Sequence, residues 1–114
     1  MKTVTDDDLL DGRIRVLARL KVLETELGGR KGPIFDKYRP NHNFGDAENL
    51  CMYDGQIAIP DDDRIYPGET RDVWITFLNR KVLSEKLKPG RQWRIQEGPR
   101  QLVATAEVLS VVYE

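Results

Sequence analysis

The sequence has very few of the residues that cross-link chains, bind metal ions or perform covalent catalysis. Its 114 residues include one cysteine, Cys51, and one histidine, His42. One cysteine excludes an internal disulfide, and the pair falls short of the ligand set of a structural zinc site. No second histidine or nucleophile stands beside His42 in the sequence, so we expect no catalytic triad and only a partly exposed polar side chain there. These absences predict a protein that is not an enzyme and has no metal or cofactor.

The chain also lacks an excess of charge of either sign and any long apolar run. Lysines and arginines number 18 against 19 aspartates and glutamates, so the net charge of −1 gives no overall attraction for a polyanion. The first residues do not contain the apolar core of a signal peptide, and no apolar run approaches the roughly 18 residues that span a membrane. We therefore expect a cytoplasmic protein with no membrane partner.

What the sequence does contain is the composition of one small globular domain. Hydrophobic residues make up 39% and charged residues 32%, which is polar but not the composition of a disordered chain. The length suits a single domain. We expect an N-terminal tail over residues 1–11, either mobile or dependent on a partner, and one domain over residues 12–114. A helical turn over residues 5–10, capped by Thr5, is the alternative for the tail.

Alternating apolar and polar residues predict β-strands. Over residues 13–24 every second residue is apolar, which buries one face of a strand and exposes the other. A helix is the alternative because several leucines partly fit a period of 3.6 residues, but Gly12 disfavours it. Five further strands are predicted over residues 38–44, 51–59, 72–78, 92–97 and 101–112. Pro67-Gly68 and Pro89-Gly90 predict type II turns between them, so the pattern favours a β-sandwich or a β-barrel.

A set of short motifs follows the strands in a fixed order. They are Gly28-Gly29-Arg30 with Tyr38-Arg39-Pro40, Gly55-Gln56-Ile57-Ala58-Ile59-Pro60, Tyr66-Pro67-Gly68-Glu69, Leu87-Lys88-Pro89-Gly90 and Arg94-Ile95-Gln96-Glu97-Gly98-Pro99-Arg100. In this order and spacing they resemble the C-terminal β-barrel, the third domain, of translation elongation factor Tu. The resemblance extends over nearly the whole chain and implies an all-β fold, a single antiparallel six-stranded barrel. Residues 28–32 are not followed by the Gly-Lys-Ser/Thr of a phosphate loop, so we expect no GTP binding.

The resemblance also implies binding residues. In elongation factor Tu the third domain holds the T-stem backbone of aminoacyl-tRNA and contacts the exchange factor and the GTPase domain. The residues of this chain that match its polar positions are Arg30, Arg39, Asn41, Glu97 and Arg100. The arginines are suited to anionic partners. In the alternative interpretation they brace neighbouring loops, and Glu97 only orients its turn. Pro99 replaces a glycine of the family's turn, which removes one backbone donor.

Two functional hypotheses remain open. In the first, the protein is a non-enzymatic module that binds a protein partner connected with translation or with factors that recognise elongation factor Tu. Its anchors are the apolar residues expected on outer strand faces, Leu17, Leu23 and Trp74. In the second, it binds RNA through a basic strand face, for which the candidates are Arg13, Arg15, Arg19, Lys21 and Lys31 together with Arg30. In the alternative to the first hypothesis, the apolar residues are only scattered surface residues. In the alternative to the second, the basic residues form only a solvated strand face.

Overall fold

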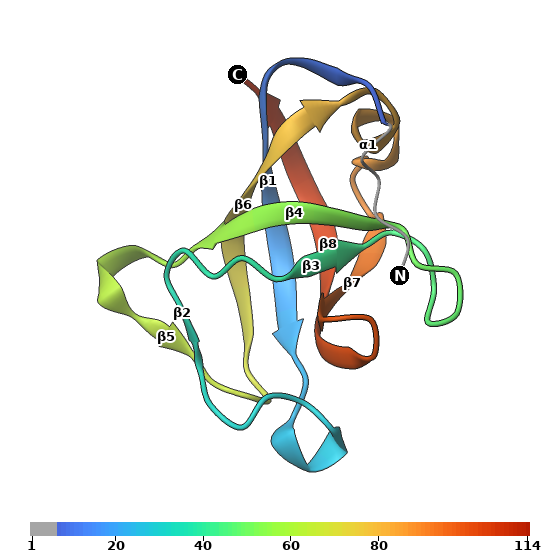
Figure 1. The fold of residues 1–114 in the computed structure, drawn as a ribbon. Coiled ribbons are helices and arrows are strands. Elements are labelled where there is room, and N and C mark those ends of the chain that lie inside the picture. The colour runs from blue at the N-terminus through green and yellow to red at the C-terminus, as the bar shows by residue number, and fades with distance from the viewer. Residues whose placement is uncertain (1–6) are drawn as a thin grey trace.

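Antiparallel strands pair with one another in a closed ring, in the order β1-β6-β4-β3-β7-β8 (Figure 1). The computed structural model describes residues 7–114. The barrel strands are β1 (Leu9–Val22), β3 (Asn41–Asn43), β4 (Met52–Ala58), β6 (Thr70–Arg80), β7 (Gln92–Glu97) and β8 (Gln101–Tyr113). Closure removes the open edges that a flat sheet would expose. The predicted fold class, an all-β single barrel of six antiparallel strands, is confirmed.

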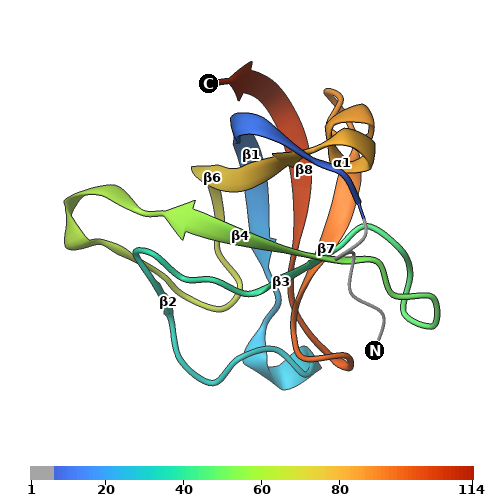
Figure 2. The ribbon, with the colours of Figure 1, turned by 45° about the horizontal axis from the view of Figure 1, so that its top comes forward.

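A small second sheet, which the sequence did not predict, stands outside the ring. It pairs β2 (Ile34–Phe35) with β5 (Arg64–Ile65). Between β4 and β5 the chain makes a tight turn, η2 (Pro60–Asp62), in which Asp61 has a left-handed backbone conformation. Both views show this segment extending away from the barrel on one side (Figures 1 and 2). A 3₁₀ helix, η1 (Thr25–Leu27), follows β1.

β1 is the longest strand of the barrel and pairs along most of its length with both β6 and β8. Its alternation places one set of side chains in the interior, where they are fully or almost fully buried: Ile14, Val16, Ala18, Leu20 and Val22. The opposite set faces outward, as the predicted strand over residues 13–24 requires. The helical alternative for this segment is therefore wrong.

The N-terminal boundary differs from the one expected at residue 11. β1 begins at Leu9, which pairs with Arg80. Residue 12 supplies the reason, since Gly12 has φ +80° and a Cβ atom there would lie 1.9 Å from the backbone oxygen of Glu114. The strand thus continues through Gly12, with a shift in its register against β6, instead of ending there. Residues 9–10 are strand, so the helical turn expected over residues 5–10 does not form there, and residues 1–6 lie outside the described part.

One α-helix, α1 (Lys81–Lys86), was also not predicted, and a distant residue caps it. The carboxylate of Asp7 accepts hydrogen bonds from the amides of Val82 at 2.9 Å and Leu83 at 3.1 Å. Tyr53 Oη donates to the same carboxylate at 2.7 Å. Burial alone raises the pKa of Asp7, but these three hydrogen bonds, with the charge of Arg80, bring the pKa below its ordinary value. Because the cap lies more than 70 residues away, no local signal marks the helix start.

The only histidine lies in the core, so the expectation that His42 is partly exposed was wrong. His42 is fully buried. Its Nε2 donates to the backbone oxygen of Gly55 at 3.1 Å, and its Nδ1 accepts from Trp93 Nε1 at 3.1 Å. Burial lowers the pKa of His42 to about 4, while the hydrogen bond to Gly55 acts in the opposite direction. The imidazole is therefore neutral, and both its nitrogens are occupied by structural hydrogen bonds.

Candidate binding surfaces

An apolar row crosses the outer face of three barrel strands. Trp74 on β6 lies opposite Leu17 on β1 and, on its other side, opposite Ala58 on β4. Leu17 and Trp74 are half-buried and Ala58 is exposed. The guanidinium carbon of Arg15 lies 4.7 Å from the centre of the Trp74 ring, the geometry of a cation–π contact. The outward position that the alternation predicted for Trp74 thus places it in a continuous apolar strip.

This strip forms the floor of a groove of about 540 Å³, which we call the Trp74 groove. Pro60, at the start of η2, adds to its apolar lining. The groove is shallow and broadly open to solvent, unlike the enclosed pockets that bury most of a small ligand. It therefore accommodates a few side chains of a partner.

Carboxylates surround the apolar floor. The groove is lined by four aspartates, Asp36, Asp61, Asp62 and Asp72, against one arginine. Asp36 accepts a hydrogen bond from the amide of Ile59 at 2.8 Å, and Asp72 lies 3.2 Å from Arg19 Nε. Asp61 and Asp62 are exposed, and within residues 7–114 their carboxylates make no hydrogen bond or ion pair. The rim of the groove is thus acidic, and two of its carboxylates are available.

Three of the five binding residues implied by the family resemblance are bonded within the protein. Arg30 Nη1 lies 3.0 Å from Glu97 Oε2, and Tyr38 Oη donates to the same carboxylate oxygen. The Arg30 guanidinium also lies 4.8 Å from the Tyr38 ring centre. Asn41 Oδ1 accepts a hydrogen bond from the amide of Gly98 at 3.1 Å. The turn between β7 and β8 is thus joined to the segment after η1 through Arg30, to the segment after β2 through Tyr38 and to β3 through Asn41. These contacts favour the interpretation in which Arg30 braces neighbouring loops and Glu97 orients its turn.

Tyr38 is half-buried in this cluster. Burial and the hydrogen bond to Glu97 both raise the pKa of its hydroxyl well above the ordinary value. The other two implied residues, Arg39 and Arg100, are exposed and make no side-chain hydrogen bond or ion pair with the described residues. The structure therefore separates the implied set into a bonded group and two free arginines.

Acidic neighbours partly neutralise the basic face expected on β1. Arg19 lies between Asp72 of β6 and Glu107 of β8, and its Nε is 3.2 Å from Asp72 Oδ1. Arg15 is paired with Glu114 at 3.5 Å. The remaining members of the predicted set, Arg13, Lys21 and Lys31, are exposed. The face is consequently less basic than its own sequence indicates.

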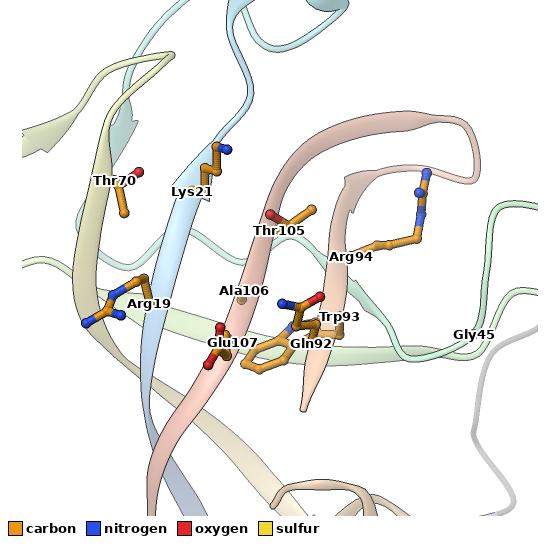
Figure 3. Close-up of a pocket in the computed structure, with 10 residues that line it drawn as sticks. All are labelled: Arg19, Lys21, Gly45, Thr70, Gln92, Trp93, Arg94, Thr105, Ala106 and Glu107. Atoms are coloured by element: carbon orange, nitrogen blue, oxygen red, sulfur yellow. The ribbon is translucent and has the colours of Figure 1, made fainter. Parts of the chain in front are cut away.

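Arg94, which was not predicted as a binding residue, joins two members of that face. Across the outer surface, Lys21 of β1 lies opposite Thr105 of β8, which in turn lies opposite Arg94 of β7. Figure 3 shows Lys21 and Arg94 on either side of Thr105, with Arg19 and Glu107 nearby. They line a hollow of about 440 Å³, here called the basic hollow. Strand alternation places Arg94 outward, but only the pairing order brings it beside Lys21.

Leu23, the third expected apolar anchor, does not belong to the Trp74 groove. It follows the end of β1, and its amide donates to the backbone oxygen of Val103 at 2.9 Å. With Leu27 and Leu102 it lines a separate hollow of about 330 Å³. The three apolar anchors proposed from the sequence thus fall on two different surfaces.

Neither a metal cluster nor a family assignment adds to these surfaces. Within residues 7–114 no group of three or more histidine, cysteine, aspartate or glutamate residues is arranged to hold a metal ion. Neither does the described part contain a helix with the length and apolar character needed to cross a membrane. No family model matches the chain.

Proposed function

We propose that this protein is a non-enzymatic module that binds a protein partner through the Trp74 groove. The observation that carries the proposal is the row of Leu17, Trp74 and Ala58 across three paired strands. Tryptophan is over-represented among the residues that dominate binding energy, and hydrogen-bonded strands hold such an anchor in a fixed position. A groove beside the anchor supplies the concave surface in which a partner side chain is desolvated.

The proposal of a non-enzymatic role is supported by the state of His42. This residue is the only histidine of the chain, and it is fully buried with both ring nitrogens hydrogen-bonded. A general base must reach the proton that it abstracts. His42 is closed off from any bound substrate, so it supplies no acid or base to a surface site.

A role in cytoplasmic translation is part of the same proposal. It is supported by the ordered motifs that resemble the third domain of elongation factor Tu and by a barrel with the implied number of strands. The proposal does not place the partner on the tRNA-contacting positions of that family. Arg30 already pairs with Glu97, and Asn41 already accepts a hydrogen bond from the amide of Gly98. A tRNA backbone would have to compete with these contacts.

Affinity capture with matched variants tests the proposal. The full chain, Trp74→Ala and Val82→Ala are each immobilised and exposed to nuclease-treated extract of the source organism. Val82 is an exposed apolar residue on α1, which both views place away from the segment after β4 (Figures 1 and 2). We expect a protein that the full chain and Val82→Ala retain and Trp74→Ala loses. If no captured protein depends on Trp74, the proposal fails.

RNA binding through the basic hollow is the second candidate function. Arg94 favours it, because with Arg19 and Lys21 it makes a cationic cluster that the β1 pattern alone did not contain. Threonine and glutamine side chains in the same hollow are suited to phosphate and sugar contacts. Glu107 within the hollow and Asp72 beside Arg19 oppose it. Capture of RNA that depends on Lys21 and Arg94 would favour this function over protein binding.

A further inference from the structure

We propose that the occupant of the Trp74 groove is an extended segment of a partner protein in which an apolar side chain is flanked by arginine or lysine. This inference rests on the proposed function and specifies the chemistry of the partner. It follows from the combination of the groove's apolar floor with the acidic rim.

The floor selects the apolar side chain. Leu17, Trp74, Ala58 and Pro60 present hydrocarbon and aromatic surface to the groove. An aliphatic or aromatic side chain that enters the groove loses its hydration on contact with this surface. This loss makes a favourable contribution to the free energy of binding. A segment whose residues are all polar gains nothing from that floor and binds it weakly.

The rim selects the flanking charge. Asp61 and Asp62 are exposed and have no partner among the described residues, whereas Asp63 is held by Arg71 Nη1 at 2.6 Å. Two adjacent free carboxylates beside an apolar floor favour a cationic neighbour and repel an acidic one. Arg15, the one cation of the groove, is compensated by Glu114 at 3.5 Å, so it does not offset the rim.

The Trp74 ring already has a cation of this chain over it, because the guanidinium carbon of Arg15 lies 4.7 Å from its centre. The preference for a cation therefore comes from the carboxylates of the rim. Arginine bonds a carboxylate through two parallel hydrogen bonds, which lysine does not. Arginine is therefore the favoured flanking residue.

The size of the groove distinguishes a segment from a folded surface. At about 540 Å³ it has room for a few side chains and is bounded on one side by η2, which extends from the barrel (Figure 2). A flat domain face does not fill a concave groove, whereas an extended chain presents successive side chains to it.

Selection from a random peptide library tests the inference without assuming a sequence. Peptides of about 12 residues displayed on phage are selected on the immobilised full chain, with depletion on Trp74→Ala. We expect the enriched peptides to carry arginine or lysine within a few positions of a leucine, isoleucine, phenylalanine or tryptophan. Enrichment of apolar peptides with neutral or acidic flanks overturns the inference. The inference is also overturned if no enriched peptide depends on Trp74 for binding.

Charge neutralisation then tests the rim directly. The variant Asp61→Asn/Asp62→Asn keeps side chains that tolerate the left-handed backbone found there, with φ 63° and 52°. We expect it to bind a selected peptide about three- to tenfold more weakly, and the loss to shrink as salt is added. The matched control is Asp54→Asn/Glu85→Gln, which removes the same charge from exposed positions outside the groove. Equal affinities of the two double variants would overturn the inference.

The two proposals fail in different ways. If affinity capture yields a Trp74-dependent protein while the selected peptides lack basic residues, the groove is a protein site but its partner is of another kind. If no captured protein depends on Trp74, the proposed function itself is wrong, and with it this inference.

Discussion

The indole nitrogen of Trp93 donates a hydrogen bond of 3.1 Å to Nδ1 of His42, and this bond fixes the imidazole as the Nε2–H tautomer. The pair lies inside the barrel, where His42 also meets the edge of Phe77 at a centroid distance of 4.8 Å. A charged imidazolium has no acceptor for a proton on Nδ1 in this arrangement, because Trp93 is a donor there. Protonation of His42 therefore requires the core to open.

This arrangement predicts a pH-dependent stability. The pKa of His42 is about 4 in the folded protein against 6.5 ordinarily, so between these values the unfolded chain binds a proton that the folded chain does not. The free energy of unfolding should therefore fall as pH is lowered from 6.5 to about 4, by at most ~3 kcal/mol. Urea unfolding across this range measures it, and His42→Gln should reduce the slope. A flat profile in the full chain would contradict the prediction.

Gly55→Ala should destabilise the barrel. A Cβ atom at this position would lie 2.7 Å from Phe77 Cε1 and 2.8 Å from His42 Nε2, both buried in the core. Overpacking of this kind costs about 1–3 kcal/mol. Gly32→Ala is the control, since nothing lies within 4 Å of a Cβ atom there and its φ is not positive. Thermal unfolding of both variants checks the prediction, and equal midpoints would refute it.

Asp7→Ala should loosen α1 and lower the stability of the whole domain by about 1–3 kcal/mol, because two amides and one hydroxyl lose their acceptor. Its pKa lies below the ordinary value of 3.8, so this stabilisation is present above pH 3.8 and is lost as pH falls further. The pH range in which this stabilisation is lost lies below the range in which His42 lowers the stability. Hydrogen exchange at the Val82 and Leu83 amides should accelerate, whereas Asp8→Ala, at an exposed neighbour, should leave both unchanged.

Matched variants should separate the two binding hypotheses. Trp74→Ala is expected to cost a protein partner about 2 kcal/mol or more of affinity with little salt dependence. Lys21→Glu with Arg94→Glu is expected to weaken RNA binding and to reduce its salt slope by roughly one unit per lost phosphate contact. Titration of the captured partner at two salt concentrations distinguishes these outcomes. A partner insensitive to Trp74→Ala but lost on charge reversal would reverse our order of preference.

Several barrel strands were predicted close to their observed bounds because their signals are local. β7 was expected over residues 92–97 and is found at Gln92–Glu97, and β8 was expected over 101–112 and is found at Gln101–Tyr113. Alternation reports which face of a strand is apolar, and the Pro-Gly pairs mark where the chain turns. Gly68 and Gly90 have φ of 91° and 90°, the left-handed conformation that the predicted turns require.

Contacts between residues far apart in the chain were not predictable in this way. The helix cap joins Asp7 to Val82, and the ion pair of Arg30 with Glu97 spans 67 positions. Strand order brings Arg94 beside Lys21 across β8 and places Asp72 against Arg19. The sequence thus established the alternation, the turns and the outward position of Trp74, since each depends on neighbouring residues. Closure of the barrel decided which charges meet, that His42 is buried and where the groove lies, because pairing between distant strands fixes those distances.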